Sequence, residues 1–573
     1  PFQLAKTAVE VAISAILGTR VDYRLIETLT ADEQELFNYH DEEELWIDYV
    51  ADLADGWNPT YTIASLLGRE SLVVPGDQGW AYRTHRGNLL IMGGDQVYPT
   101  ASREAYRTRL IGPYECAFDP GKPEPPLPEE AAKPYPHLFA IPGNHDWYDG
   151  LISFTRLFSQ GRTLAGWTTR QRRSYFALQL PGRWWLLGVD IQLEADIDRP
   201  QLEYFRNVAK QMQTNDKVIL CTAAPDWIYG NIHDKGLENN LAFLEKRVIE
   251  GVAGAKVLVT LSGDLHHYRR HESVGETLPI HKITAGGGGA FLHPTNGPDV
   301  SSITIGPEGS ETHLNLKAEF PTRAESNRMT FSNLLFPILN PSFGLVTGFA
   351  YLMIIWLLTS ELDVGLQDIP FTLGNISTLF ELTLHAIVSK PSILAWGIII
   401  VAAFTFFTDS DSKLFRYLAG SIHGFSHLIA CLFIGWGVIR EVSHTFDMAQ
   451  GTFIRFIASG AGVFIGGYLA GGILMGIYLF ISLYFFGNHL NEAFSSLKIE
   501  DYKNFLRLHI DSDGKLTIYP IGIKKVPRSW VLAPDPGLND PKLVPANNET
   551  IEVALMEPPI KVVTDPIERP DKS

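Results

Sequence analysis

The feature that most constrains this chain is a change of character near residue 330. Before that point, short apolar runs alternate with charged stretches, which is typical of a soluble α/β domain. After it, long apolar runs without any charged residue occupy 334–358, 392–408, 417–439 and 456–486. A bilayer core about 30 Å thick needs roughly 20 apolar residues per helix. The sequence therefore predicts a soluble α/β part followed by an α-helical transmembrane bundle of about four helices.

The last apolar run is rich in glycine, at positions 460, 462, 466, 467, 471, 472 and 476. Small residues let helices approach closely in a membrane. We expect these glycines to pack within one subunit, and a homo-oligomer through the same face is the alternative. In the third run, His423 and His427 lie four residues apart on one helix face. A pair at this spacing can ligate a metal or haem, but polar packing between helices is the expected role.

Charged residues between the apolar runs indicate an orientation. Basic residues flank the second, third and last runs, namely Lys413, Arg416, Lys498, Lys503 and Arg507. The loop after the first run is mainly acidic, and the segment 371–390 carries Glu381 and His385 and is expected at the membrane interface. With four spans, the positive-inside bias places both the N-terminal domain and the C-terminal region in the cytoplasm.

Composition narrows the class of partner. The 573-residue chain carries a formal net charge of -17, which argues against a nucleic-acid partner, because such binding needs a basic footprint. The 3 cysteines lie far apart and form no CxxC pair. We expect four regions: an N-terminal helical segment over 1–40, an α/β domain over 41–328, the transmembrane region over 329–490, and a cytoplasmic C-terminal region with a proline-rich tail over 491–573.

Polar residues recur directly after the apolar runs of the α/β domain. The runs are "LWIDYV", "NLLIM", "HLFA", "WWLLG", "KVILC" and "KVLVTLS". Ligands of open α/β sheets bind outside the carboxyl ends of strands. Residues that follow these runs are Asp52, Asp95, Asn144, His145, Asp146, Asp264 and His266. Any one of these residues alone would be expected only to form a turn. The recurrence of polar residues after successive strands predicts a ligand-binding site.

This series resembles the calcineurin-like metallophosphoesterase superfamily, through "GGDQVYP", "GNHDWYDG" and "SGDLHH". The resemblance covers roughly residues 45–289 and extends to a membrane-bound branch of that superfamily. It implies a β-sandwich flanked by helices, with two metal ions at strand ends that activate water against a phosphate mono- or diester. The partners it implies are a phosphoester substrate and the lipid bilayer.

The resemblance also implies a role for each residue. Asp95 matches the carboxylate that bridges two metals, with Asp52 and His266 completing the first site and Asn144 and Asp264 the second. His145 matches the histidine that contacts phosphate and protonates the leaving oxygen. Asp146 is expected to orient His145 by accepting its other ring N–H.

Three departures from the family pattern change the expected metal. Ala54 and Ala223 stand where histidines belong, with Asp55 as a replacement ligand for the first, and Asp264 replaces a third histidine. A site rich in carboxylate favours Mn²⁺ or Mg²⁺ over Zn²⁺. We therefore expect one or two divalent metal ions per chain.

Two neighbouring features remain open. The four glycines of "TAGGGGA" either present N–H groups to phosphate or allow a tight backbone crossing, and His293 follows them. His267 is expected to point to solvent. The leading hypothesis for the whole chain is a membrane-anchored, metal-dependent phosphoesterase. The alternatives are a non-catalytic membrane scaffold with a degenerate phosphoesterase domain, and a transport protein with a regulatory domain.

Overall fold

The computed structural model describes residues 35–76, 80–118, 136–191, 197–232, 240–276, 278–297, 299–306, 311–360, 362, 365–408, 410, 412–445, 453–537 and 539–562. These residues form two compact units. One unit spans Ala324–Lys498, and the other joins the chain up to Arg323 with the chain from Ile499 onwards. The described part of the predicted N-terminal helical segment is not helical, because Phe37–Asn38 forms strand β1 and pairs with β9. The rest of that segment, residues 1–34, lies outside the described residues.

The larger unit is built on two sheets of nine strands each among the described residues. The first has the order β1-β9-β10-β11-β12-β14-β13-β16-β15 and the second the order β21-β18-β17-β2-β5-β6-β8-β7, with β22 paired to β18. Strands of the first sheet are β9 Phe176–Leu180, β10 Trp184–Gly188, β11 Lys217–Cys221, β12 Lys256–Ser262, β13 Tyr268–Ser273, β14 His281–Ala285, β15 Ser302–Ile305 and β16 Thr312–Phe320. Strands of the second sheet are β2 Leu45–Val50, β5 Leu89–Met92, β6 His137–Ala140, β7 Thr163–Leu164, β8 Trp167–Thr169, β17 Lys503–Ile510, β18 Leu516–Ile523, β21 Ala554–Leu555 and β22 Ile560–Val562.

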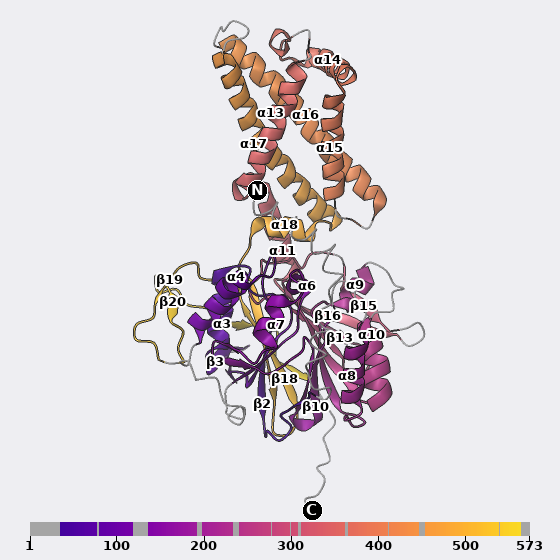
Figure 1. The fold of residues 1–573 in the computed structure, drawn as a ribbon, viewed down its shortest axis with the longest axis vertical. Helices are drawn as coiled ribbons and strands as arrows, with labels where there is room; N and C mark the ends of the chain where they lie inside the picture. The colour runs from indigo at the N-terminus through magenta and orange to yellow at the C-terminus, as the bar shows by residue number, and fades with distance from the viewer. Residues whose placement is uncertain are drawn as a thin grey trace, which may run out of the picture. The chain divides into compact units, whose positions relative to one another are not determined.

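The two sheets pack face to face, and helices cover their outer faces. Along β5, Leu89 and Ile91 pack into the layer between the sheets, whereas Leu90 and Met92 pack under helices. The helices of this second sheet include α3 Trp57–Leu67, α4 Arg103–Ala105, α5 Gly112–Ala117 and α7 Ile152–Phe158. The first sheet is covered by α8 Arg199–Ala209, α10 Asn240–Phe243 and η6 Leu244–Ala253 (Figure 1). Because the central strands are buried on both faces, they are almost continuously apolar.

All six apolar runs that predicted strands are strands. Three of them, β2, β5 and β6, are parallel neighbours in one sheet. The other three, β10, β11 and β12, are parallel neighbours in the other sheet. Within each sheet, the carboxyl ends of these strands therefore meet at one edge, and the polar residues that follow them are brought together.

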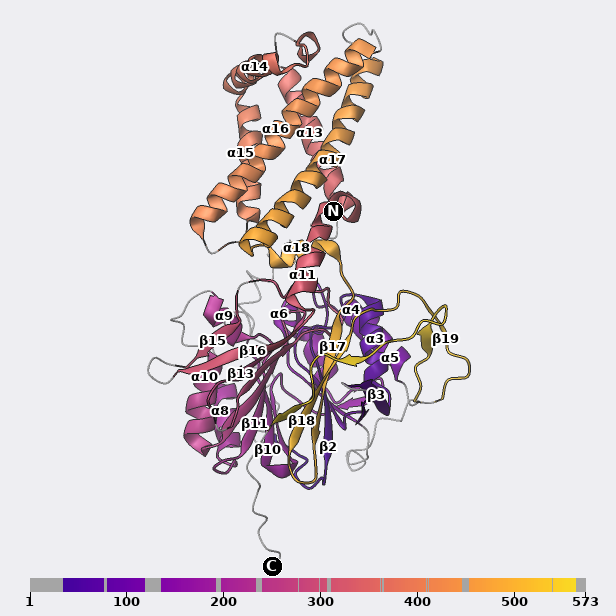
Figure 2. The same ribbon diagram turned by 180° about the vertical axis from the view of Figure 1, so that it is seen from behind.

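The chain after the apolar helices completes the second sheet. Residues 506–510 of β17 pair antiparallel with residues 45–49 of β2 (Figure 2). Nε of Arg507 donates to Oδ1 of Asp48 at 2.8 Å, and both side chains are fully buried. Lys503 is likewise buried in β17. The predicted C-terminal region is therefore part of the α/β unit as far as Val562, and Lys503 and Arg507 are not loop charges beside a membrane.

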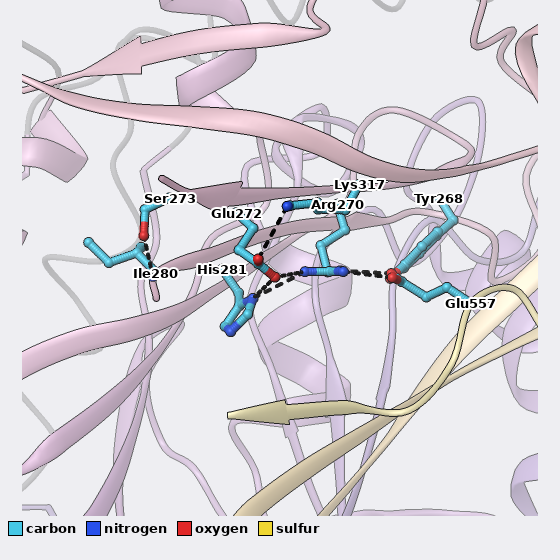
Figure 3. A network of polar contacts seen from close by, with 8 residues as sticks. All are labelled: Tyr268, Arg270, Glu272, Ser273, Ile280, His281, Lys317 and Glu557. Atoms are coloured by element: carbon cyan, nitrogen blue, oxygen red, sulfur yellow. Dashed lines mark hydrogen bonds and ion pairs between the residues drawn. The ribbon is translucent and has the colours of Figure 1, made fainter. Parts of the chain in front are cut away.

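A second buried ion pair ties the C-terminal segment to β13. The carboxylate of Glu557 accepts hydrogen bonds from Nε and Nη2 of Arg270 at 2.8 and 2.7 Å, and from the hydroxyl of Tyr268 (Figure 3). Nη1 of Arg270 also donates to Glu272, which contacts Lys317 on β16. Arg270 of the "DLHHYRR" stretch, four residues beyond His266, thus has a structural role in holding Glu557 against β13.

The smaller unit consists mainly of long apolar helices. Its helices include α11 Arg323–Thr330, α12 Phe336–Leu339, α13 Pro341–Thr359, α14 Ile376–Ser389, α15 Pro391–Phe407, α16 Lys413–Thr445, α17 Phe453–Phe486 and α18 Leu490–Leu497. Among the described residues, α13, α16 and α17 are long and apolar enough to cross a membrane. The pair α14 and α15, bent by 106°, gives a fourth span if it counts as one. The chain is therefore a membrane protein with three or four candidate spans.

The glycines of α17 are used for packing within the chain. A Cβ added to Gly467 would lie 2.8 Å from Tyr351, and one added to Gly471 would lie 2.2 Å from Thr347, both on α13. Gly462 and Gly466 face α16 in the same way. A homo-oligomer would therefore need another face of α17.

The histidine pair of α16 is buried, and its polar contacts are between the two rings and to a tyrosine of α13. Nε2 of His427 lies 3.2 Å from Nε2 of His423, and Nδ1 of His427 lies 3.0 Å from the hydroxyl of Tyr351. This is the polar packing between helices that the sequence predicts.

Candidate functional site

Three acidic residues begin the site, each two or three positions beyond the last residue of a strand. Asp52 follows β2, Asp95 follows β5 and Asp264 follows β12. All three have left-handed backbone conformations, with φ of 57°, 50° and 67°. A positive φ is uncommon for residues other than glycine and costs roughly 1–3 kcal/mol where the surroundings enforce it. The backbone strain therefore coincides with the carboxylates that the sequence predicts as ligands.

The hydroxyl of Tyr98 joins three of the predicted ligands. It lies 2.9 Å from Oδ1 of Asp52, 2.9 Å from Oδ2 of Asp95 and 2.8 Å from Nε2 of His266. All four side chains are buried. Tyr98 was absent from the predicted site, although it follows Asp95 by three residues in "GGDQVYP".

The imidazole of His266 presents an unprotonated Nε2 to this hydroxyl. Its Nδ1 lies 2.8 Å from the carbonyl oxygen of Phe291, which only accepts, so Nδ1 carries the hydrogen. Burial lowers the pKa of His266 well below 6.5, and the neighbouring His293 and Lys503 lower it further. The ring is therefore neutral, with the tautomer that a metal ligand needs.

The buried group contains more acceptors than protons. One hydroxyl proton of Tyr98 cannot satisfy two carboxylates and an imidazole nitrogen at once. Burial raises the pKa of Asp95 to about 7, with the Asp264 carboxylate adding to the rise, and burial together with the Asp95 carboxylate raises the pKa of Asp52 well above its usual value. In the part of the chain that is described, Oδ2 of Asp52 and Oδ1 of Asn144 are buried without a hydrogen-bond partner. This surplus of oxygen and nitrogen acceptors fits a bound cation.

Carboxylates and imidazoles alone do not form a metal site in the described part of the chain. Among these residues, no three His, Cys, Asp or Glu side chains are arranged to hold an ion by themselves. The contacts of Tyr98, at 2.8–2.9 Å, are ordinary hydrogen-bond distances. Its hydroxyl therefore lies among Asp52, Asp95 and His266 as their common hydrogen-bonding neighbour.

The GNHD residues lie beside the same carboxylates. The backbone N–H of His145 donates to Oδ1 of Asp95 at 2.9 Å. Nδ1 of His145 lies 2.6 Å from the carbonyl of Pro99, and its ring packs 4.2 Å from the ring of Tyr98 between centroids. Nδ1 therefore carries a hydrogen, and Nε2 is the ring nitrogen that can serve a substrate.

The predicted role of Asp146 is wrong. Its carboxylate accepts from the backbone N–H groups of Gln96 and Gly143 and, at 2.6 Å, from the hydroxyl of Tyr106. Pro99, not Asp146, is the partner of the His145 ring. Asp146 is fully buried and ties the loop after β5 to the loop after β6, so it supports the site without facing it.

Asp55 is not among the residues that Tyr98 joins. Its Oδ2 accepts from the backbone N–H of Phe291 at 3.3 Å, and Lys503 is a nearby positive charge. Nζ of the buried Lys503 in turn donates to the carbonyl of Ala290. Asp55 and Lys503 thus hold the loop whose Phe291 carbonyl orients His266.

Ala223, beyond the end of β11, has no side-chain donor atom, but the hydroxyl of a tyrosine on the following helix contacts Asp264. Tyr229 of α9, Asp226–Ile232, donates from its hydroxyl to Oδ2 of Asp264. The sequence did not predict that Tyr229 reaches the site, because Tyr229 lies six residues after Ala223, where the family pattern has its histidine.

The four glycines form a tight crossing. The N–H of Gly288 donates to the carbonyl of Ala51, and the carbonyl of Gly287 accepts from Asn504 of β17. A Cβ on Gly286 would lie 2.0 Å from Oδ2 of Asp52. The N–H groups of Gly286 and Gly288 donate to the carbonyls of His267 and Ala51, so these two are not presented to phosphate.

Two histidines flank this crossing. The ring of His293 stacks on His266 with centroids 3.9 Å apart. His267, predicted to point to solvent, is instead only 2 % exposed. His267 is therefore part of the core beneath the site, and the prediction of a solvated ring is wrong.

Comparison with known proteins adds little to this geometry. No protein-family model matches the chain, and no curated protein matches it. Three chains of solved structures match. One of them, described as GAP50, the anchor in the inner membrane complex of Plasmodium, is 12% identical, with 50% of this chain and 93% of that chain covered. Its TM-score is 0.28, which does not establish a shared fold.

Proposed function

We propose that this chain is a membrane-anchored, metal-dependent phosphoesterase that hydrolyses a phosphate mono- or diester. The observation that carries the proposal is the convergence of Asp52, Asp95 and His266 on the hydroxyl of Tyr98. In a buried position, such a surplus of acceptors is costly unless a cation or protons compensate it. The oxygen-rich donor set favours Mn²⁺ or Mg²⁺ over Zn²⁺.

One group of residues would bind the cations, and another residue would act on the substrate. Asp52, Asp95, Tyr98 and His266 would hold the first ion, and Asp95, Asn144 and Asp264 would hold the second. A bound divalent ion supplies a water of lowered pKa and neutralises phosphate charge. His145 keeps one hydrogen on Nδ1 through Pro99, so its Nε2 is the atom that would protonate the leaving oxygen.

A second function, a non-catalytic membrane scaffold, is favoured by one observation. The phenol of Tyr98 lies within hydrogen-bond distance of three predicted ligands without an ion, and Ala54 and Ala223 stand where histidines belong in the resembling family. On this reading, the tyrosine fills the place of the first cation and no second cation is needed. The same purified protein can separate the two functions.

The deciding experiment uses the full chain in detergent, stripped of metal and reloaded with Mn²⁺, Mg²⁺ or Zn²⁺. Metal per chain is measured by mass spectrometry, beside hydrolysis of p-nitrophenyl phosphate and its bis-ester. We expect Asp95→Asn to lose metal and turnover, and His145→Ala to keep metal and lose turnover about 100-fold or more. The exposed turn residue Asp513 gives the control Asp513→Asn. Wild type without metal, or with metal and no turnover on either ester, would favour the scaffold.

We further propose that the chain crosses the membrane four times between its two α/β segments. Support comes from the sheet, because β17 pairs with β2 and both must lie on one side of a membrane. Three spans would separate them, so α15 must cross as well. Its 17 residues span about 25 Å, close to the thickness of a bilayer core.

The side on which the α/β unit lies is proposed to be the cytoplasm. Charge at the described helix ends is not the support for this side, because basic residues lie at both ends: Lys413, Arg416 and Lys498 at one, and Lys390, Arg440 and Arg455 at the other. The three cysteines, Cys116, Cys221 and Cys431, are free thiols. Free thiols without disulfides are typical of a reducing compartment.

A further inference from the structure

We propose that Tyr229 is a positioning residue for the second cation and that it compensates, from helix α9, for the histidine absent at Ala223. The inference rests on the proposed function, since it concerns the second of the two cations. It assigns a role to a residue outside the series of strand-end motifs.

The resemblance to the metallophosphoesterases places a histidine donor to the second cation at the position of Ala223. A Cβ added to Gly94 would lie 2.7 Å from the Cβ of Ala223 and 3.5 Å from the backbone of Gly143. Gly94 precedes Asp95, and Gly143 precedes Asn144. The alanine methyl therefore packs against Gly94, which precedes the proposed ligand Asp95, but it offers no donor atom.

The hydroxyl of Tyr229 reaches the third proposed ligand of the same ion. It donates to Oδ2 of Asp264, whose backbone N–H donates to Oδ1 of Asp52 at 3.1 Å. A phenol with an ordinary pKa near 10 is protonated at neutral pH, so it is the donor and the carboxylate is the acceptor. Tyr229 thus fixes the orientation of Asp264 relative to the rest of the group.

Helix α9 is anchored well enough to hold this hydroxyl in place. Trp227 and Ile228 are buried in the core under the first sheet. The side chain of Asn231 bonds the backbone of Thr304 on β15 twice, at 3.1 Å each. A side chain on a pinned helix loses little freedom when its carboxylate partner binds an ion.

The side-chain oxygen of Asn144 provides a second observation that supports the second cation site. Its Oδ1 is buried without a hydrogen-bond partner in the described part of the chain, as an amide oxygen awaiting a cation would be. The oxygen ligands of this ion would then come from Asp95, Asn144 and Asp264. Tyr229 would not bind the ion itself but would hydrogen-bond the carboxylate of Asp264. Loss of such an outer hydrogen bond typically weakens metal affinity by about 10–100-fold.

The test is a calorimetric titration of the metal-free full chain with Mn²⁺, comparing wild type with Tyr229→Phe. This substitution removes one oxygen atom and keeps the ring. We expect two equivalents in wild type, and in Tyr229→Phe an unchanged first equivalent with the second weakened about 10–100-fold. Tyr82→Phe, on the partly exposed strand β4, Ala81–His85, is the matched control and should equal wild type.

Two results would overturn the assignment while leaving the proposed function standing. The first is an unchanged second equivalent in Tyr229→Phe, which would show that the phenol does not support that ion. The second is a single equivalent in wild type that becomes two in Tyr229→Phe, which would show that the phenol blocks the ion. Absence of any bound Mn²⁺ in both proteins would instead overturn the proposed function itself. Thermal unfolding without metal confirms that each variant is folded.

Discussion

The hydroxyl of Tyr98 lies 2.8 Å from Nε2 of His266, although the two residues are 168 positions apart in the chain. Tyr98 belongs to the loop after β5 in one sheet, and His266 to the loop after β12 in the other. Their contact therefore joins the two sheets at the edge where the parallel strands end. The same hydroxyl contacts Asp52 and Asp95, so it is the common neighbour of the proposed first ligand set.

Tyr98→Phe should weaken the first equivalent of Mn²⁺ by about 10–100-fold, because the variant loses one of four donors. Calorimetric titration of the metal-free chain measures this directly, with Tyr82→Phe as control. Tighter binding in the variant would mean that the phenol occupies the place of the ion. That outcome would support the scaffold.

Labelling of engineered cysteines should show four crossings. In a background with Cys116→Ser, cysteine at Ser412, before α16, should react from the same side of oriented vesicles as the α/β unit. Cysteine at Thr372, between α13 and α14, should react only from the opposite side. A Ser412→Cys protein that reacts from the Thr372 side would contradict the crossing of α15.

Arg507→Met should destabilise the α/β unit by about 3–5 kcal/mol, because it leaves the carboxylate of Asp48 buried without its cation. The double variant Asp48→Leu with Arg507→Met should recover most of this loss, since it removes both charges. Urea unfolding in detergent, monitored by tryptophan fluorescence, reports the difference. Lys515→Met breaks an exposed pair with Asp513 and should stay within about 0.5 kcal/mol of wild type.

His271→Gln should reduce the loss of stability in acid. His271 is fully buried, its Nε2 lies 2.7 Å from the carbonyl of Val300, and burial lowers its pKa to about 4. Between pH 6.5 and 4 the unfolded chain binds a proton at this ring and the folded chain does not. Stability from this ring is therefore present above pH 6.5 and is lost as the pH falls toward 4.

The measurement for His271 is a difference between two pH profiles. The unfolding free energy of wild type should fall by about 1 kcal/mol more per pH unit than that of His271→Gln between pH 6.5 and 4. Buried carboxylates such as Asp52 and Asp146, with raised pKa values, give the opposite slope and are common to both proteins. Parallel profiles would show that the ring is protonated in the folded state.

Much of the candidate site could be predicted from local patterns. A largely apolar run followed by a small residue and Asp is typical of a buried parallel strand with a ligand at its end, and this pattern located Asp52 after Ala51, Asp95 after Gly94 and Asp264 after Gly263. The long uncharged runs located the apolar helices for an equally local reason, since bilayer thickness sets their length. These patterns can be recognised without knowing which strands pair in the folded chain.

The local sequence pattern could not predict the direction in which a side chain points after a strand. Asp146 follows His145 directly, yet its carboxylate turns inward to Tyr106, because the turn after β6 points the two side chains to different surroundings. The hydroxyls of Tyr98 and Tyr229 reach the site from positions outside the motif series. Their reach depends on loop and helix conformations that only packing determines.

The sequence by itself determined the strand ends, their carboxylates and the apolar helices, because each follows from composition and period within a few neighbouring residues. The tertiary structure decided that residues 499–562 complete the α/β unit and that two tyrosines join the site. The physical reason is that pairing of β17 with β2, and burial of Arg507 against Asp48, are contacts over more than 450 residues. Such contacts gain their free energy from buried area and matched hydrogen bonds, which exist only once the two segments meet.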